Sequence, residues 1–312
     1  MTGVETDRPD PAGDDRVEPA LGGGAVRRGA PRPGGRPERV RAMRPMEWAF
    51  PPSPVRREVL CVLPGSDTGR PPLLFVHGTR HGAWAFAEHW LPAAAERGFP
   101  AHAVSLRGHG GSGGRDQLRR STLGDYVHDV HQAAVALPRP PILIGHGAGA
   151  VVVARVLARY PARAGVLATP YPVGPGLDLL AQTLVRDPVS VLRMAIGVGA
   201  RARAERLFVD APDAASLLDR LGPESRRLPY QLALHRAPGR ARGGAPMLVV
   251  GATRDAVVPA RSVLRTARHY RTRPVMLDGV GHDLMLDGGW AGPLATILDW
   301  ADHVCSPAGA AR

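Results

Sequence analysis

Apolar residues between positions 57 and 304 fall into short continuous runs, separated by longer stretches in which they recur at helical spacing. A continuous apolar run is typical of a strand buried on both faces, as in a parallel sheet covered by helices. Strands are predicted at 73–76, 102–106, 142–144, 165–168, 247–250 and 275–277, and helices near 82–97, 121–136, 148–160, 259–270 and 290–303. This alternation predicts an α/β fold with a mostly parallel sheet and helices on both faces.

The segment 171–242 interrupts the alternation with a long stretch rich in arginine and leucine. We expect it to be a helical insertion, or cap, that lies over the carboxyl edge of the sheet. Open α/β folds bind their ligands at that edge. The sequence therefore predicts one domain over 55–312 that carries a cap at about 171–242.

The first 54 residues differ in composition from the rest, since 18 of these 54 positions are proline or glycine. Such a segment buries too little apolar surface to offset the entropy lost on ordering. We expect 1–54 to be a disordered extension. Met43 and Met46 stand just before the first apolar run, and we hypothesise that translation starts at one of them.

Composition places the chain among soluble enzymes of ordinary size, with 44% hydrophobic residues, 22% charged residues and two cysteines. Cys61 and Cys305 form no C-x-x-C motif and are expected to be free thiols in a reducing compartment. No apolar run resembles a signal peptide or a membrane span. We expect a cytoplasmic protein without a membrane partner.

The net charge of +12 comes from 40 cationic residues, all of them arginine, scattered along the whole chain. A surface that binds nucleic acid gathers its cations on one face or in runs. We therefore expect a small-molecule ligand and no nucleic-acid partner.

Chemistry concentrates in the glycine-rich turn at 145–149, which reads Gly-His-Gly-Ala-Gly between a predicted strand and a predicted helix. One interpretation is a dinucleotide-binding turn, which would require an acidic residue about 20 residues further on. The segment 166–173 contains no acid. The other interpretation is a nucleophile elbow, G-x-S-x-G, in which Gly147 occupies the serine position.

Four further segments support the elbow. A His-Gly-Thr-Arg-His-Gly-Ala-Trp segment follows the strand at 73–76, and Arg-Gly-His-Gly-Gly-Ser follows the next one. Asp255 and His282 come after the last two strands. In this order the chain resembles the α/β-hydrolase family from about residue 57 to 304, most closely its capped esterase and hydroxynitrile-lyase-like members.

The resemblance implies an acid–histidine pair of Asp255 and His282, and an oxyanion hole made by the backbone N–H groups of Thr79 and Ala148. It also implies that His77 and His146 are structural hydrogen-bonding residues. The family usually carries serine where this chain has Gly147. Three hydroxyls stand nearby in sequence, those of Thr79, Ser105 and Ser112, and none is expected to be presented from the elbow.

Covalent acyl transfer needs a side-chain nucleophile that a histidine deprotonates. Because glycine has none, we expect His282, oriented by Asp255, to act as a general base on a small ester, thioester or carbonyl compound. Three alternatives remain open. They are a non-catalytic binding protein on the same fold, use of the same dyad for lyase or isomerase proton abstraction, and a dinucleotide-binding oxidoreductase.

Residues of the predicted cap are expected to line a moderately hydrophobic pocket: Tyr171, Phe208, Tyr230, Leu179, Leu180, Leu184 and Met194. No cofactor is predicted. No metal site is predicted either, because His128 and His131 stand one helical turn apart without a third ligand, and we interpret them as part of a solvated face.

Overall fold

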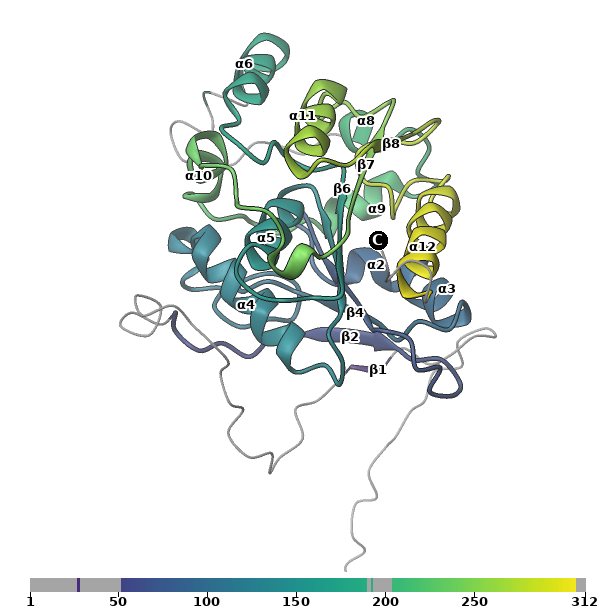
Figure 1. The fold of residues 1–312 in the computed structure, drawn as a ribbon. Coiled ribbons are helices and arrows are strands. Elements are labelled where there is room, and N and C mark those ends of the chain that lie inside the picture. The colour runs from purple at the N-terminus through teal and green to yellow at the C-terminus, as the bar shows by residue number, and fades with distance from the viewer. Residues whose placement is uncertain (1–26, 29–51, 190–191, 193–203, 307–312) are drawn as a thin grey trace, which may run out of the picture.

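The computed structural model describes residues 27–28, 52–189, 192 and 204–306. Within them an eight-stranded sheet has the order β1-β2-β4-β3-β5-β6-β7-β8 (Figure 1). Its strands are β1 (Arg27–Arg28), β2 (Val59–Val62), β3 (Leu73–Val76), β4 (Ala101–Val104), β5 (Ile142–His146), β6 (Ala164–Ala168), β7 (Met247–Ala252) and β8 (Pro274–Leu277). Strands β3 to β8 pair in parallel, whereas β1 and β2 are antiparallel to their neighbours. The prediction of an α/β fold with a mostly parallel sheet is confirmed.

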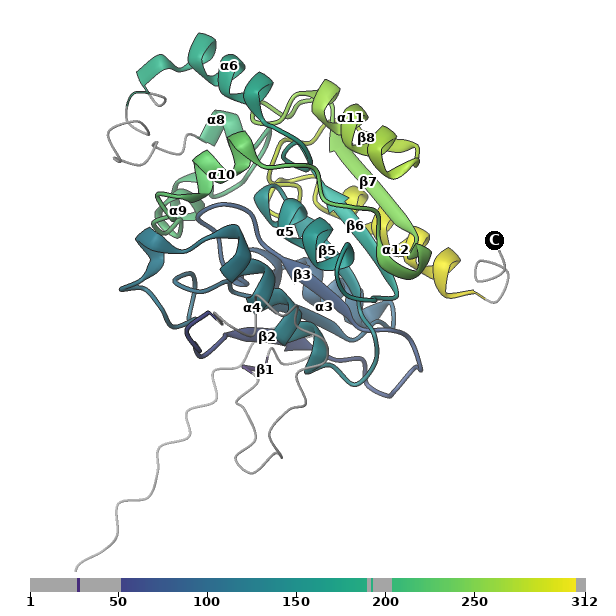
Figure 2. The same cartoon turned by 60° about the vertical axis from the view of Figure 1, so that its left-hand side comes forward.

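Helices cover both faces of the sheet, as Figure 2 shows. Leu73 and Phe75 of β3 point into one apolar cluster, and Leu74 and Val76 point into the other. The first cluster includes α2 (Trp84–Ala87), α3 (Trp90–Glu96) and α12 (Ala291–Cys305). The second includes α4 (Leu123–Val135), α5 (Ala148–Leu157) and α11 (Ala260–Tyr270). Burial on both sides explains why these strands are apolar without alternation.

The structure differs from the prediction in two places. The expected helix at 82–97 is divided into α2 and α3. Strand β2 was not predicted, because it is short and only its alternate residues, Leu60 and Val62, are buried.

The predicted extension over 1–54 lies mostly outside the described residues, as do Met43 and Met46. Two parts of it are described: residues 52–54 and the two-residue strand β1, which pairs with Leu60 and Cys61 of β2.

The segment 171–242 contains α6 (Leu177–Arg186), α8 (Ala204–Leu207), α9 (Ala214–Asp219) and α10 (Leu228–Leu234), and no strand among its described residues. It contacts loops that follow two strands of the sheet. The backbone N–H of Gly222 donates to the carbonyl of Arg80 at 2.8 Å, and that of Asp283 donates to the carbonyl of Leu207 at 3.0 Å. Arg80 follows β3 and Asp283 follows β8, so these contacts lie at the carboxyl edge of the sheet.

In the part of the chain that is described, no helix has the length and apolar character needed to span a membrane.

Candidate active site

Gly147 forms the turn between β5 and α5, with φ 55° and ψ −117°. An L-residue with a side chain adopts this backbone conformation only at a cost of about 1–3 kcal/mol. Glycine adopts it without that cost. The turn is fixed by a hydrogen bond of 3.0 Å from the Gly147 N–H to the Ala168 carbonyl at the end of β6. The chain thus keeps a sharp strand-to-helix turn at this position while lacking a side chain there.

The two flanking glycines allow parts of the chain to approach closely. A Cβ atom on Gly149 would lie 2.3 Å from the His77 carbonyl oxygen, and one on Gly145 would lie 2.5 Å from the carbonyl oxygen of Gly149. Both separations are far below van der Waals contact. Close packing of the first turn of α5 against β5 and against the residues at the end of β3 therefore accounts for these glycines. A dinucleotide-binding turn also uses a glycine for close packing of helix on strand, so these glycines by themselves do not distinguish the two interpretations of the turn.

His282 and Asp255 form a hydrogen-bonded pair beside the turn. Asp255 follows β7, His282 follows β8, and Nδ1 of His282 lies 2.9 Å from Oδ2 of Asp255. The other Asp255 oxygen accepts hydrogen bonds of 2.7 Å from the backbone N–H groups of Val257 and Val258. The carboxylate is thereby held in place, and it orients the imidazole.

The other ring nitrogen of His282 faces Gly147. A Cβ atom built on Gly147 would lie 3.3 Å from Nε2 of His282 and 3.7 Å from the Cα of Gly78. Three chain segments that are far apart in sequence, those after β3, β5 and β8, therefore meet at one point. Gly147, His282 and Asp255, three of the residues named by the family resemblance, are brought together there.

The electrostatics of His282 favour its protonated form. Burial by itself disfavours the imidazolium, but the charge and hydrogen bond of Asp255, together with the charge of Asp283, raise the pKa of His282 above its usual value. A raised pKa makes the neutral imidazole of His282 a stronger base than a free imidazole.

Tyr171, one of the expected pocket residues, packs beside the dyad. Its ring stacks on that of His282 with a centroid separation of 6.1 Å, and its N–H donates to the Gly147 carbonyl at 3.2 Å. Its hydroxyl hydrogen bonds with the side chain of Thr79. Burial raises the pKa of Tyr171 to about 12. The phenol is therefore neutral over the physiological range and serves as a hydrogen-bonding group.

Three of the other expected pocket residues have side chains that the structure describes. Phe208 is buried in the apolar cluster that contains α12, and Tyr230 and Leu184 are exposed on α10 and α6. The side chains of Leu179 and Leu180, and all of Met194, lie outside the described residues. A helical pattern of apolar residues does not distinguish a residue that packs in the core from one that lines a pocket.

The nearby hydroxyls of Ser105 and Ser112 have structural roles. Ser105 donates to a carboxylate oxygen of Glu58 at 2.7 Å and accepts from the Ala83 N–H at 2.8 Å. Ser112 donates to the Ser105 carbonyl at 2.6 Å and accepts from the Glu58 N–H at 2.9 Å. Both are buried and bonded away from the turn at Gly147.

Behind His282 lies a buried charged network that sequence reasoning missed. Asp283 is fully buried, with Oδ2 at 3.1 Å from Nε2 of His81 and Oδ1 at 3.4 Å from Nε2 of His146. Burial raises the pKa of this carboxyl, but the opposing effects of His81, His146 and His282 lower it to about 2. Asp283 follows His282 directly, so the sequence shows an acidic residue at this position. Its partners His81 and His146 come from distant segments, so the sequence does not show that they contact it.

Asp287 is a second missed residue. Its buried carboxylate accepts from the N–H groups of Gly281 at 2.6 Å, Val209 at 3.0 Å and Asp210 at 2.7 Å. It thus ties the loop that carries His282 to the segment after α8.

The two histidines expected to be structural are buried and bonded to the backbone. Nε2 of His77 accepts from the Leu106 N–H at 3.0 Å, and Nε2 of His146 lies 3.1 Å from the His282 carbonyl. Burial lowers the pKa of His146 to about 3, so the ring is neutral and donates through Nε2.

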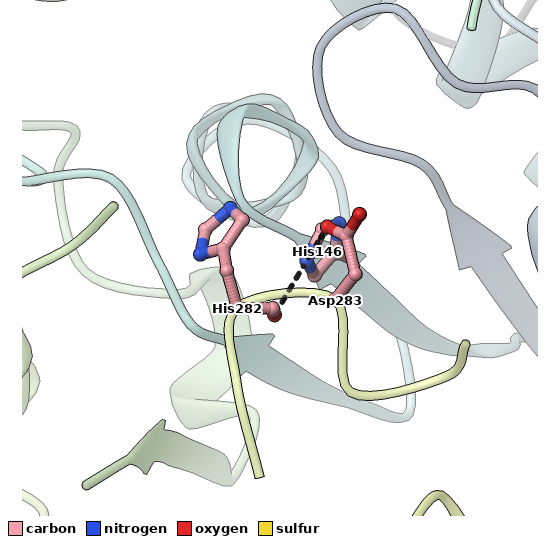
Figure 3. A group of neighbouring side chains, drawn as sticks. All are labelled: His146, His282 and Asp283. Carbon is pink, nitrogen blue, oxygen red and sulfur yellow. Dashed lines mark hydrogen bonds and ion pairs between the residues drawn. The ribbon is translucent and has the colours of Figure 1, made fainter. Parts of the chain in front are cut away.

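His146, His282 and Asp283 are the one group among the described residues that brings three candidate metal ligands within 4.8 Å of one another (Figure 3). Nδ1 of His282 is engaged by Asp255, and Nε2 of His146 is engaged by the His282 carbonyl. The other nitrogen of each ring is not engaged in this way, since Nδ1 of His146 has no hydrogen-bond partner among the described residues and Nε2 of His282 faces Gly147. The engaged nitrogens belong to a hydrogen-bonded network around Asp283.

The prediction that His131 lies on a solvated face of α4 is wrong. This side chain is buried and stacks on Tyr160 with a centroid separation of 3.6 Å. Tyr160 follows α5, so the spacing of residues along α4 could not predict this contact.

Comparison with solved structures finds many similar chains. A soluble variant of monoglyceride lipase from Saccharomyces cerevisiae has a TM-score of 0.65 at 12% identity, covering 81% of this chain and 93% of its own. The esterase EaEST from Exiguobacterium antarcticum has a TM-score of 0.59 at 16% identity, covering 80% of this chain and 96% of its own. The enol-lactonase from Burkholderia xenovorans LB400 has a TM-score of 0.56 at 15% identity, covering 79% and 97%. At such identities the likeness establishes the fold.

No curated protein sequence matches the chain. A family model does match, over residues 73–290, a range that begins at β3 and ends at the start of α12 and includes the turn at Gly147 and both members of the dyad. Sheet order, site geometry and this match lead to one conclusion: the chain belongs to the alpha/beta hydrolase family.

Proposed function

We propose that this protein hydrolyses a small, moderately hydrophobic ester, thioester or related carbonyl compound through general-base activation of water by His282, without an acyl-enzyme. One observation carries the proposal. The position of a Cβ on Gly147 is 3.3 Å from Nε2 of His282. A water oxygen at that position would accordingly be within hydrogen-bonding reach of a base that Asp255 already orients.

In the proposed reaction, Nε2 of His282 accepts a proton from water while the water oxygen bonds to the carbonyl carbon. The carbonyl oxygen becomes an oxyanion that the N–H groups of Thr79 and Ala148 stabilise. The intermediate then expels the alkoxide or thiolate, which takes the proton from the His282 imidazolium. Atoms and charge balance, because the products are an acid and an alcohol or thiol.

Two features of the surroundings support this assignment. Ala148 is the first residue of α5, so its N–H belongs to the unsatisfied positive end of the helix. The side chain of Thr79 is held by the neutral hydroxyl of Tyr171. Donors fixed in advance in this way are the main source of oxyanion stabilisation in acyl-transfer enzymes.

The similar structures are a lipase, an esterase and a lactonase, which favours ester chemistry over other uses of the dyad. Proton abstraction from a carbon atom, as in a lyase or isomerase, would use the same base. A substrate screen that finds such a reaction and no ester hydrolysis would favour this alternative.

A non-catalytic binding protein is the second candidate, and Gly147 itself favours it. Glycine at φ 55° removes the strain that a nucleophile would impose. The retained dyad argues against this candidate, because binding alone does not require a histidine oriented by a carboxylate.

The test is turnover of a panel of p-nitrophenyl esters and acyl thioesters by the wild type and by His282→Gln. We expect His282→Gln to lower kcat/KM by about 10²–10⁴-fold, the usual contribution of a positioned base. His303→Gln, on an exposed residue near the end of α12, is the matched control and should match the wild type. Intact-mass spectra during turnover should show no acylated protein.

Equal turnover by His282→Gln and the wild type would overturn the proposal. Saturable ligand binding without turnover in either protein would instead support the binding-protein candidate.

A further inference from the structure

A cavity of about 470 Å³ lies beside the candidate active site. Four parts of the chain line it: Glu58 before β2, residues 80–84 after β3, residues 108–115 after β4, and residues 220–223 after α9. Neither Gly147 nor His282 is among its lining residues. Its size is typical of small-molecule sites.

Cationic side chains dominate the lining. Arg80, Arg115 and Arg220 contribute three guanidinium groups, and Glu58 contributes the one carboxylate of the lining. That carboxylate accepts hydrogen bonds from Ser105 Oγ at 2.7 Å and from the Gly111 N–H at 2.8 Å. These interactions hold the carboxylate in place, and it keeps its negative charge.

A second acid stands behind the wall and is also engaged. Glu224 accepts from the Tyr126 hydroxyl at 2.7 Å and from the Arg80 N–H at 3.1 Å, and it pairs with His109 Nε2 at 3.3 Å. Burial disfavours the charged form of His109, but this pairing and hydrogen bonding raise its pKa. The cavity therefore keeps an excess of positive charge after both acids are counted.

All three arginines make contacts within the lining. Nε of Arg80 donates to the Gly222 carbonyl at 2.9 Å, and the guanidinium of Arg115 donates to the Gly110 carbonyl at 2.9 Å. The guanidinium of Arg220 lies 4.1 Å over the ring of Trp84, which in turn stacks on His81 at 5.5 Å. A guanidinium fixed over an aromatic ring loses little entropy when it binds a ligand, and its planar fork matches the oxygens of a carboxylate or phosphate.

From these contacts we propose that the cavity is a binding site for an oxyanion, the carboxylate or phosphate group of a small ligand, held by Arg80, Arg115 and Arg220. The site goes beyond the proposed hydrolytic function and does not depend on it. It is connected to the dyad through His81, which lines the cavity and whose Nε2 lies 3.1 Å from Asp283.

The experiment is a titration of the full-length protein with inorganic phosphate, pyrophosphate and succinate in chloride buffer, followed by isothermal calorimetry and by Tm. We expect saturable binding of at least one of these anions. A stronger response to phosphate and pyrophosphate would identify a phosphorylated ligand, and a stronger response to succinate a carboxylated one.

Variants of the lining residues fix the location. Arg115→Gln and Arg220→Gln should each weaken binding about tenfold, the usual effect of losing one charge-assisted hydrogen bond. Glu58→Gln should strengthen it, because it removes a negative charge from the lining while keeping an acceptor oxygen. Arg119→Gln, on an exposed arginine outside the lining, is the matched control.

His282→Gln should bind the anions like the wild type, so loss of hydrolysis and loss of anion binding are separate results. The proposal is overturned if no anion binds saturably. It is equally overturned if Arg119→Gln weakens binding as much as Arg115→Gln and Arg220→Gln, or if Glu58→Gln leaves binding unchanged in a folded protein.

Discussion

Replacement of Gly147 by serine is the most direct test of the site's geometry. The backbone at this position, φ 55° and ψ −117°, already has the conformation that presents a side chain from the turn. The added Cβ would lie 3.3 Å from Nε2 of His282, so only a small adjustment of the ring is required. The serine hydroxyl would then be within hydrogen-bonding reach of the base.

The substitution has a predictable effect on stability. A non-glycine residue in this conformation costs about 1–3 kcal/mol. For a domain of this size, about 1 kcal/mol lowers Tm by roughly 2–4 °C. Gly147→Ala introduces the same Cβ and the same strain without a hydroxyl, and it should lower Tm by a similar amount.

The gain in activity should belong to serine alone. We expect Gly147→Ser to react with a fluorophosphonate probe and to release p-nitrophenol from p-nitrophenyl acetate in a burst. Its kcat/KM should exceed that of Gly147→Ala by at least about 100-fold, the lower end of the contribution of a positioned base. The probe adduct should map by mass spectrometry to residue 147, and Gly147→Ser combined with His282→Gln should not react.

The reasoning would be refuted by a Gly147→Ser protein that is folded, as judged by circular dichroism and Tm, but labels no faster than Gly147→Ala. That result would mean that His282 and the oxyanion donors are not arranged for acyl transfer.

Three other outcomes are expected. First, a general base must be neutral, and the pKa of His282 is raised. In a pH–rate profile, wild-type kcat/KM should therefore increase as pH rises through a value above about 6.5. The profile of His282→Gln should not show this increase. Second, the pKa of Asp283 is 3.8 in the unfolded chain and about 2 in the folded protein. Ionised Asp283 therefore contributes about 2 kcal/mol to the free energy of unfolding above pH 3.8, and this contribution is lost as pH falls towards 2. In urea titrations between pH 5 and pH 2, Asp283→Asn should show a shallower decline of the unfolding free energy than the wild type, and an equal decline would contradict the assigned pKa. Third, Asp287→Ala leaves three backbone N–H groups without their acceptor, so it should lower the free energy of unfolding by about 3 kcal/mol or more. Asp299→Ala removes an exposed side chain of α12 and should change the free energy of unfolding by less than about 1 kcal/mol.

Much of the fold could be predicted because buried parallel strands leave a strong local signal. The runs at 73–76, 142–144 and 165–168 are apolar on consecutive residues, and each lies within an observed strand. Strand β2 escaped prediction because it lies next to the antiparallel edge, where only alternate residues are buried. Pocket residues in the 171–242 segment were harder still, because an apolar stripe on a helix is the same whether it meets the core or a ligand.

The sequence by itself determined which residues stand at the ends of the strands: Gly147 after β5, Asp255 after β7 and His282 after β8. Their order and spacing are local properties of the chain, and parallel strands bring their carboxyl ends to one edge. Only the tertiary structure decided what surrounds them. The buried network of Asp283 and His81, the stacking of Tyr171 on His282, and the arginine-lined cavity join residues up to 202 positions apart. Such contacts depend on how loops pack against one another, and no periodicity along the chain records that packing.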